Sequence, residues 1–200
     1  MPSRRSVLAG ALAAALLPAR AFSAVPRDAQ AVVDRFTAAR TMTGRFIQLA
    51  HDGSQAEGTF KIGRPGKARF DYLPPSALKM IADGRSVALA NGKLKTWDLY
   101  PLSKTPLKLL LAERVTLADR LVRSVEGEDG LLSVRLADPD LFGNAFVDVM
   151  FDRETGDLRQ WTVTDNTRRE TSVVVYDVRT GEKFPPSTFR IPYSEIRTLK

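Results

Sequence analysis

The 200-residue chain contains no cysteine and a single histidine, His51. Without cysteine it can form no disulfide, so packing alone must stabilise any folded domain. With no thiol and one histidine, the usual nucleophile–base pair of a hydrolase and the dense ligand cluster of a metal site are both missing. We therefore expect a binding protein rather than an enzyme, with no cofactor and no metal.

The sequence also lacks a long hydrophobic run. Its most apolar stretch, residues 7–17, follows Arg4 and Arg5 and is much shorter than the roughly 20 residues that cross a bilayer. A short apolar stretch behind two positive charges is typical of an export signal. We expect residues 1–21 to be a cleaved signal peptide and the mature protein to lie in the periplasm.

Two details of this export signal stay open. Cleavage after Ala21, at the small residues of the sequence Ala19-Arg20-Ala21, is favoured over cleavage after Ala24. The paired arginines approach the twin-arginine pattern, so either that route or the ordinary secretory route fits. No cysteine follows the cleavage region, so the protein itself is not expected to be lipidated.

Positive charge is in modest excess. The chain has a formal net charge of +7, and the three arginines of the signal peptide leave with it, so the mature protein carries about +4 (7 − 3). Nucleic-acid binding requires a basic stripe. Here the basic residues alternate with apolar ones along the predicted strands, as on a solvated face. We expect no nucleic-acid partner, and one monomeric domain over residues 22–200.

Acidic residues offer the remaining enzymatic possibility. Glu126, Glu128 and Asp129 are close in sequence, as are Asp138 and Asp140. A pair of carboxylates can hydrolyse sugars, but such a site also needs an aromatic groove. Both groups lie beside glycine or proline, so we expect solvated turn acids.

What the sequence has in abundance is short alternating strands. Turn dipeptides such as Asp83-Gly84, Asn91-Gly92 and Asp129-Gly130 separate runs in which apolar and polar residues alternate, a pattern typical of antiparallel hairpins. We expect about eleven strands, at 44–49, 58–62, 68–72, 78–82, 86–90, 94–98, 131–137, 145–151, 158–164, 170–178 and 187–191.

Two helical segments accompany these strands. Apolar residues at helical spacing predict an amphipathic helix over 27–40. The leucine-rich segment 101–122 interrupts the strands, with Thr105 as a helix N-cap before Pro106 and a second short turn over 117–122. Two helical elements on one curved sheet would make a half-open barrel with a lid and an apolar pocket. The pattern alone fits an α+β core without a cavity slightly better.

Several segments then resemble one family. They read GTFKIGRPGKARFDY (58–72), IADG (81–84) and PLSKTPL (101–107), followed by FDR and LRQWTVTD between 151 and 165. In this order they are similar to the outer-membrane lipoprotein carrier family, LolA. The resemblance implies a mainly β fold, an incomplete antiparallel barrel with a helical lid over an apolar cavity.

The resemblance also implies a function. Family members carry acylated lipoproteins across the periplasm, from an inner-membrane ABC transporter of LolCDE type to the outer membrane, with or without a LolB-like receptor there. Two alternatives on the same half-barrel stay open. One is a carrier of another apolar ligand such as free lipid, and the other is a sensor of mislocalised lipoproteins.

Strand parity predicts which side chains line the cavity, because residues two apart on a strand share a face. The strand residues that we expect there, with two from the lid, are Phe46, Phe60, Ile62, Phe70, Tyr72, Leu78, Met80, Leu109 and Leu110. Phe146, Met150, Trp161 and Val163 are weaker candidates.

Arg64 is the polar residue of interest. By parity it shares the apolar face with Phe60 and Ile62, and in the family the matching arginine holds the lid through backbone carbonyls. The alternative is that parity breaks at Gly63 and leaves Arg64 in solvent. Near it, Ala68 stands where many family members have a larger apolar residue, so the tightness of binding stays open.

Overall fold

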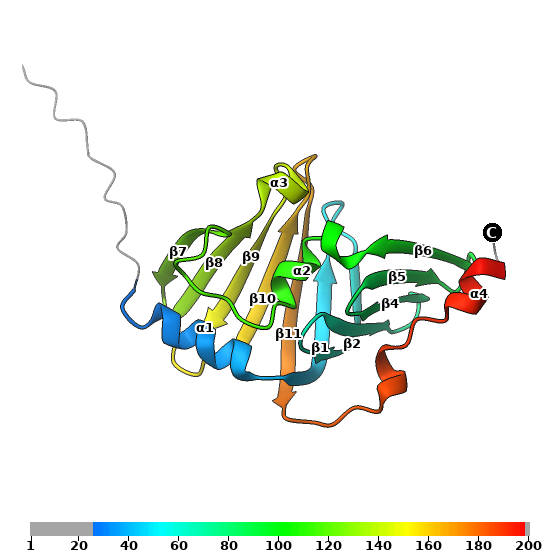
Figure 1. The fold of residues 1–200 in the computed structure, drawn as a ribbon, viewed down its shortest axis with the longest axis horizontal. Coiled ribbons are helices and arrows are strands. Elements are labelled where there is room, and N and C mark those ends of the chain that lie inside the picture. Colours follow the sequence, from blue (N-terminus) through cyan, green and yellow to red (C-terminus); the bar gives the residue numbers. More distant parts are fainter. Residues whose placement is uncertain (1–25, 199–200) are drawn as a thin grey trace, which may run out of the picture.

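The computed structural model describes residues 26–198, so the expected signal peptide and both cleavage sites lie outside the described residues. Figure 1 shows a broad, curved sheet with helices on its hollow side. The strands are β1 (Thr41–Leu49), β2 (Gln55–Gly63), β3 (Lys67–Tyr72), β4 (Leu78–Asp83), β5 (Ser86–Asn91), β6 (Thr96–Pro101), β7 (Val122–Glu128), β8 (Leu131–Ala137), β9 (Phe146–Asp152), β10 (Leu158–Thr164) and β11 (Glu170–Thr180).

The strands form one antiparallel sheet of eleven, in the order β6-β5-β4-β3-β2-β1-β11-β10-β9-β8-β7. Each half, β1–β6 and β7–β11, is a meander in which consecutive strands pair through short turns. The two halves join where β1 pairs with β11. Because β6 and β7 do not pair with each other, the barrel is incomplete, as the family resemblance implies.

The count of eleven strands is right, but one member differs. Residues 187–191 were expected as a strand, whereas Pro186–Phe189 form the 3₁₀ helix η2. Pro185 and Pro186 supply no backbone N–H for a sheet. The eleventh strand is instead β7, whose residues are mostly charged or small and bury only Val125 completely. An edge strand with one buried side chain shows little alternation of apolar and polar residues, so the sequence does not predict it.

The helices are shorter than predicted. Helix α1 spans Ala29–Ala38 and buries the apolar side chains that the 3.6-residue period identifies. The segment between β6 and β7 holds η1 (Leu102–Lys104) and α2 (Leu107–Leu110). Thr105 does not cap α2, because its hydroxyl donates to the Leu102 carbonyl. Residues 117–121 form turns rather than a helix, and Val122 begins β7. The remaining helices are α3 (Pro139–Phe142) and α4 (Tyr193–Thr198).

The sheet has apolar cores on both faces. On the concave face, α1 and the segment around α2 lie over the sheet (Figure 1), and most of the buried side chains are between them and the strands. On the convex face, the C-terminal segment packs Ile191 and Ile196 against Ile81 and Ala88 of β4 and β5. None of the helices within 26–198 is long and apolar enough to cross a membrane.

Candidate functional site

The concave face of the β1–β6 half is built on one row of cross-strand neighbours. Phe60 pairs with Phe70, Phe70 with Met80, and Met80 with Leu89. Directly paired residues project to the same side of an antiparallel sheet. Since Phe60 and Phe70 are buried under the helices, the whole row faces the concave side.

Aromatic side chains connect the two halves of this face. The Phe46 ring lies 5.2 Å from Phe70 and 5.0 Å from Tyr72, both in edge-on contacts, and Phe70 lies 5.8 Å from Trp161 on β10. Gly58 makes room for Phe46, because a Cβ there would come within 2.6 Å of the ring. The aromatic cluster therefore forms the floor at the centre of the half-barrel.

The predicted lining residues differ in how open they are. Tyr72 and Met80 are half-buried, and Leu78 is 41% exposed. The others are buried: Phe46, Phe60, Ile62, Phe70, Leu109 and Leu110. Of the weaker candidates, Trp161 and Val163 lie on the concave face. Phe146 and Met150 pair with Ala137 and Ser133 on the convex face and do not line it.

The lid is the segment 102–121, which includes η1 and α2, and it fills the space that was expected to be a cavity. Leu109, Leu110 and Leu111 are each at most 6% exposed. Leu109 and Leu110 meet Phe36 from α1 and Val149 from β9 around a remaining void of only about 10 Å³. The structure thus shows the lid closed, with its leucine side chains seated on the apolar face.

Arg64, at the end of β2, reaches the underside of the lid. Its Nη1 donates to the Leu110 carbonyl at 2.7 Å and to the Ala112 carbonyl at 3.1 Å. These carbonyls end the short α2 and lack helical partners of their own, so a cationic donor satisfies them. The neighbouring backbone adds a third bond, from Gly66 N to the Leu111 carbonyl.

The environment of Arg64 is unusual for a cation. The side chain is 8% exposed, and its Nε and Nη2 find no acceptor among the described residues. Burial lowers the pKa of Arg64 to about 10, which leaves the group charged at neutral pH. The guanidinium carbon lies 4.2 Å above the Phe36 ring, a cation–π contact that offsets part of the lost hydration.

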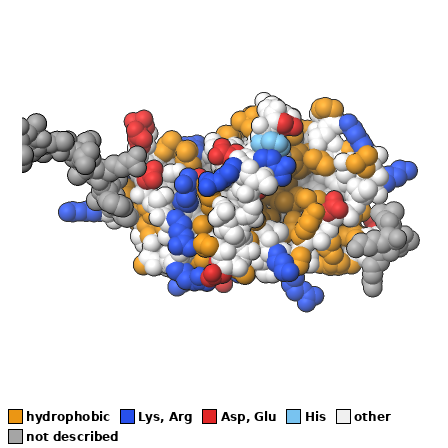
Figure 2. All heavy atoms as spheres, turned by 90° about the horizontal axis from the view of Figure 1, so that it is seen from above, with side chains coloured by type: hydrophobic (Ala, Val, Ile, Leu, Met, Phe, Trp, Pro, Cys, Tyr) orange, Lys and Arg blue, Asp and Glu red, His pale blue; other side chains and the backbone are white. Residues whose placement is uncertain are grey.

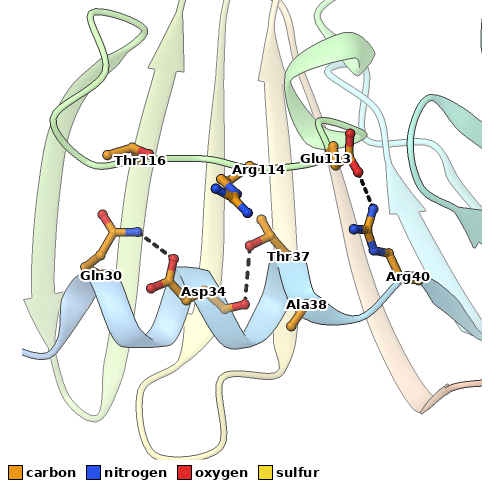
Figure 3. Close-up of a pocket in the computed structure, with 8 residues that line it drawn as sticks. All are labelled: Gln30, Asp34, Thr37, Ala38, Arg40, Glu113, Arg114 and Thr116. Atoms are coloured by element: carbon orange, nitrogen blue, oxygen red, sulfur yellow. Dashed lines mark hydrogen bonds and ion pairs between the residues drawn. The ribbon is translucent and has the colours of Figure 1, made fainter.

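A second set of polar contacts fastens the loop that follows α2. The Gln30 amide nitrogen donates to the Val115 carbonyl at 3.3 Å, while its oxygen accepts the Leu117 N–H at 2.8 Å. Nearer α2, Arg40 and Glu113 form an exposed ion pair. Gln30, Arg40 and Glu113 line a groove of about 790 Å³ between α1 and the loop. Figure 3 shows their side chains, with that of Arg114 extending towards the helix.

Tyr72 is the other polar group in the apolar floor. Its hydroxyl donates to Gln48 Oε1 at 2.6 Å, and burial raises the pKa of Tyr72 to about 12. The phenol therefore stays protonated and paired.

The sequence does not predict Gln30, which holds the loop after α2, or Leu89, which is exposed on the concave face. Gln30 carried no signal, because its partners are 85 and 87 residues away in the chain. Leu89 could have been found, since it continues the parity of the Phe70–Met80 row onto β5.

Groups suited to catalysis are dispersed. His51 is exposed in the turn between β1 and β2, and Glu126 is exposed on β7. Asp138 departs from the expected solvated acid: it is 4% exposed, and its nearest cation is Arg120, at 4.0 Å. Within residues 26–198, no three potential metal-ligating side chains come together.

Several known proteins are similar in sequence to this chain over most of its length. An outer-membrane lipoprotein carrier protein of Methylococcus capsulatus is 28% identical over 162 residues, covering 76% of this chain and 77% of the relative. One from Pseudomonas fluorescens is 24% identical over 174 residues, covering 82% and 84%. An uncharacterized conserved protein of Thermus thermophilus, 11% identical, shares the fold alone, with a TM-score of 0.51 over 83% of this chain and 95% of that one.

The family comparison agrees with the geometry of the half-barrel and its lid. The sequence model of the family described as outer membrane lipoprotein carrier protein LolA matches residues 37–192, which run from the end of α1 to the segment before α4. The chain therefore belongs to the LolA family of outer membrane lipoprotein carrier proteins.

Proposed function

We propose that the protein is a periplasmic carrier that shields the acyl chains of lipoproteins and moves them from the inner to the outer membrane. Each CH₂ group removed from water contributes about 0.8 kcal/mol, so a lipid anchor with dozens of them does not cross an aqueous compartment unaided. The carrier must cover the chains and still release them.

The observation that carries the proposal is the way the concave face is closed. Three successive leucines of the lid are buried there, and the void beside Leu109 and Leu110 is about 10 Å³. An acyl chain and a leucine side chain have the same apolar chemistry, so one can replace the other without leaving unpaired polar groups. Acyl chains would displace Leu109 and Leu110 from the sheet, and the leucines would return when the chains leave.

The polar contacts of the lid suit a closure that must reopen. Arg64 holds the end of α2 from inside, and Gln30 and the Arg40–Glu113 pair hold the following loop from outside. Exposed ion pairs contribute little, commonly about 0–1 kcal/mol. In this proposal Arg64 controls the lid, and the side chains predicted to line the cavity contact the acyl chains once the lid has moved.

Partners follow from this role. The carrier would receive its cargo from an inner-membrane ABC transporter of LolCDE type and would deliver it to the outer membrane, directly or to a LolB-like receptor. Export to the periplasm would depend on the signal peptide proposed for residues 1–21.

The proposal is tested with the mature protein and a synthetic triacylated lipopeptide. An apolar dye such as bis-ANS should gain fluorescence on the protein and lose it when the lipopeptide is added, whereas the same peptide without acyl chains should have no effect. Mass spectrometry of the protein purified from its own periplasm should find lipoproteins. A bound free lipid or pigment, with no competition by the lipopeptide, would favour a carrier of another apolar ligand.

A further inference from the structure

The hairpin turn between β5 and β6 projects one apolar side chain into solvent. Leu94, at its tip, is 70% exposed, more than any other large hydrophobic side chain of residues 26–198. The turn is ordered by its own sequence, because Asn91 Oδ1 accepts the N–H groups of Lys93 at 3.1 Å and Leu94 at 3.2 Å. Lys95 then takes the left-handed conformation, with φ 54°, that closes the turn. The turn therefore holds Leu94 outwards, between two lysines.

A neighbouring loop adds two more exposed leucines. Gly92 N donates to the Ala77 carbonyl at 2.9 Å, so the β3–β4 loop lies against the hairpin. Leu73 and Leu78, at either end of that loop, are 42% and 41% exposed. Single exposed leucines are ordinary on a protein surface, whereas several on adjoining turns indicate an interaction site. We call Leu73, Leu78 and Leu94 the leucine rim.

The charge at the leucine rim is positive. Lys93 and Lys95 are exposed and form no ion pair in the part of the chain that the structure describes. Asp98, the next acid along the chain, pairs with Leu89 and so faces the concave side. Seen from above, hydrophobic and basic side chains are interspersed over the half of the molecule that holds β1–β6 (Figure 2). The rim therefore combines apolar side chains with unpaired cations.

A hollow of about 540 Å³ adjoins the leucine rim on the convex side of the sheet. Lys79 and Trp97 line it from the strands, and Lys95 lines it from the turn. Asp71 also lines it, but this carboxylate pairs with Arg69 at 2.7 Å and with Lys79 at 3.7 Å. The hollow is therefore cationic, and its volume is within the roughly 300–1,000 Å³ of small-molecule sites. Tryptophan beside lysine is typical of protein surfaces at the headgroup level of a bilayer.

We infer that the leucine rim, together with Lys93 and Lys95, docks on the surface of a bilayer that carries anionic headgroups. The leucine side chains enter the boundary between headgroups and acyl chains, while the lysines pair with lipid phosphates. A phosphate headgroup fits the cationic hollow beside them. The inference rests on the proposed function and deepens it, because it lets the carrier release cargo into a membrane without a receptor protein.

A bilayer suits this surface better than a protein partner does. The three leucines lie on two turns at the strand ends rather than on a flat face, and a stable protein interface needs about 800 Å² from each partner. Each lysine near an anionic membrane strengthens binding by about fivefold, so the contact stays reversible. Leu78 is also one of the side chains predicted to line the cavity, so a docked carrier presents that cavity to the bilayer.

The first measurement places a fluorescent probe on the rim. Because the natural chain has no cysteine, Leu94→Cys gives a single labelling site for nitrobenzoxadiazole, whose emission shifts to the blue in an apolar environment. The labelled mature protein is mixed with vesicles of phosphatidylcholine, either alone or with an equal share of phosphatidylglycerol. Emission should shift on the anionic vesicles only and should return at about 0.5 M salt, which screens the lysines. Leu141→Cys is the matched control, because Leu141 is 50% exposed in α3 but follows an acid, Asp140, and its probe should not shift.

Vesicle flotation then measures the affinity of unlabelled variants. Leu94→Glu should weaken binding to the anionic vesicles by at least about tenfold, since it places a charge in the apolar boundary. Lys93→Ala combined with Lys95→Ala should weaken it by about 25-fold, fivefold for each lysine. Leu141→Glu should bind as the natural protein does. All four side chains are exposed, and circular dichroism checks that each variant is folded.

Each contrary result has a defined meaning. If the natural protein docks on anionic vesicles but does not bind the triacylated lipopeptide, the proposed function fails and the docking surface stands. If it binds the lipopeptide but floats with neither kind of vesicle, or if Leu94→Glu and the double lysine variant float as the natural protein does, the docking surface is wrong and the carrier role stands. A loss of binding in Leu94→Glu that appears only when the vesicles contain an outer-membrane protein would assign the rim to a protein partner and overturn the inference.

Discussion

The guanidinium carbon of Arg64 lies 4.2 Å from the centre of the Phe36 ring. Through this contact and its bonds to the Leu110 and Ala112 carbonyls, one side chain at the end of β2 touches both helical elements that cover the concave face. An opening of the lid in which α1 does not move would break the two bonds and leave the contact with Phe36 in place. Arg64 can therefore stay ordered while the lid moves.

Arg64→Leu should shift the carrier towards its loaded state. The substitution removes two charge-assisted bonds, each worth about 1.5–3 kcal/mol, from the closed lid and adds apolar surface beside Phe36. Uptake should continue and delivery should fail, so immunoblots of periplasmic extracts should show carrier with lipoprotein attached. Arg64→Lys should restore delivery only in part, because an ammonium group lacks the planar fork of a guanidinium. Delivery at the normal rate by Arg64→Leu would remove Arg64 from lid control.

Gln30→Leu should loosen the loop after α2 without opening the core. It removes both the bond to the Val115 carbonyl and the acceptor for the Leu117 N–H, at about 0.5–1.5 kcal/mol each. Hydrogen exchange of the Leu117 amide should speed up by about tenfold. Gln30→Glu keeps an acceptor for that amide and serves as the matched control. Equal exchange in Gln30→Leu and the natural protein would show that the loop is held elsewhere.

The closed lid should be insensitive to pH over the physiological range. The hydrogen bond from Arg40 lowers the pKa of Glu113 below its ordinary value of 4.5, so the carboxylate form is favoured in the closed state. The stabilisation is present above that ordinary pKa and is lost as the pH falls through the lowered one. Dye access to the concave face should stay constant from about pH 8 to pH 5 and rise only below about pH 4. A change between pH 8 and pH 5 would point to another titrating group.

Substitutions of buried and of exposed residues on the concave face should change the free energy of unfolding by different amounts. Phe60 is fully buried, so Phe60→Ala should lower the free energy of unfolding by about 3–5 kcal/mol. Leu89 is 41% exposed, so Leu89→Ala should change the free energy of unfolding by less than about 1 kcal/mol. Urea denaturation measures both. A large loss for Leu89→Ala would mean that Leu89 belongs to the folding core.

The sequence predicts the sheet far better than the lid's attachments. Alternation is a local signal, so Phe60, Phe70 and Met80 could be placed on one face from their spacing alone. Arg64 could be assigned to that face by the same rule. The partners of Gln30 could not be predicted, because they depend on how residues more than 80 positions apart meet in space. The expected cavity also depended on side-chain packing, which parity does not determine.

In the C-terminal segment, the sequence predicts buried residues correctly but assigns them to a strand that does not form. Apolar Phe189 and Ile191 suggested a strand, and Pro185 and Pro186 prevented it. Their burial comes from covering the convex face, where Phe189 lies against Gly63 and Ile191 against the β4–β5 pair. A sequence pattern identifies a buried residue but not the face of the sheet that buries it.

The central claim is that acyl chains replace the lid leucines on the sheet. Spin labels at Lys108, exposed on α2, and at Thr59, exposed on the convex side of β2, measure the distance between lid and sheet by double electron–electron resonance. The distance should be longer when triacylated lipopeptide is bound and should return to its original value when the lipopeptide is removed. Stoichiometric binding of the lipopeptide with an unchanged distance would contradict it.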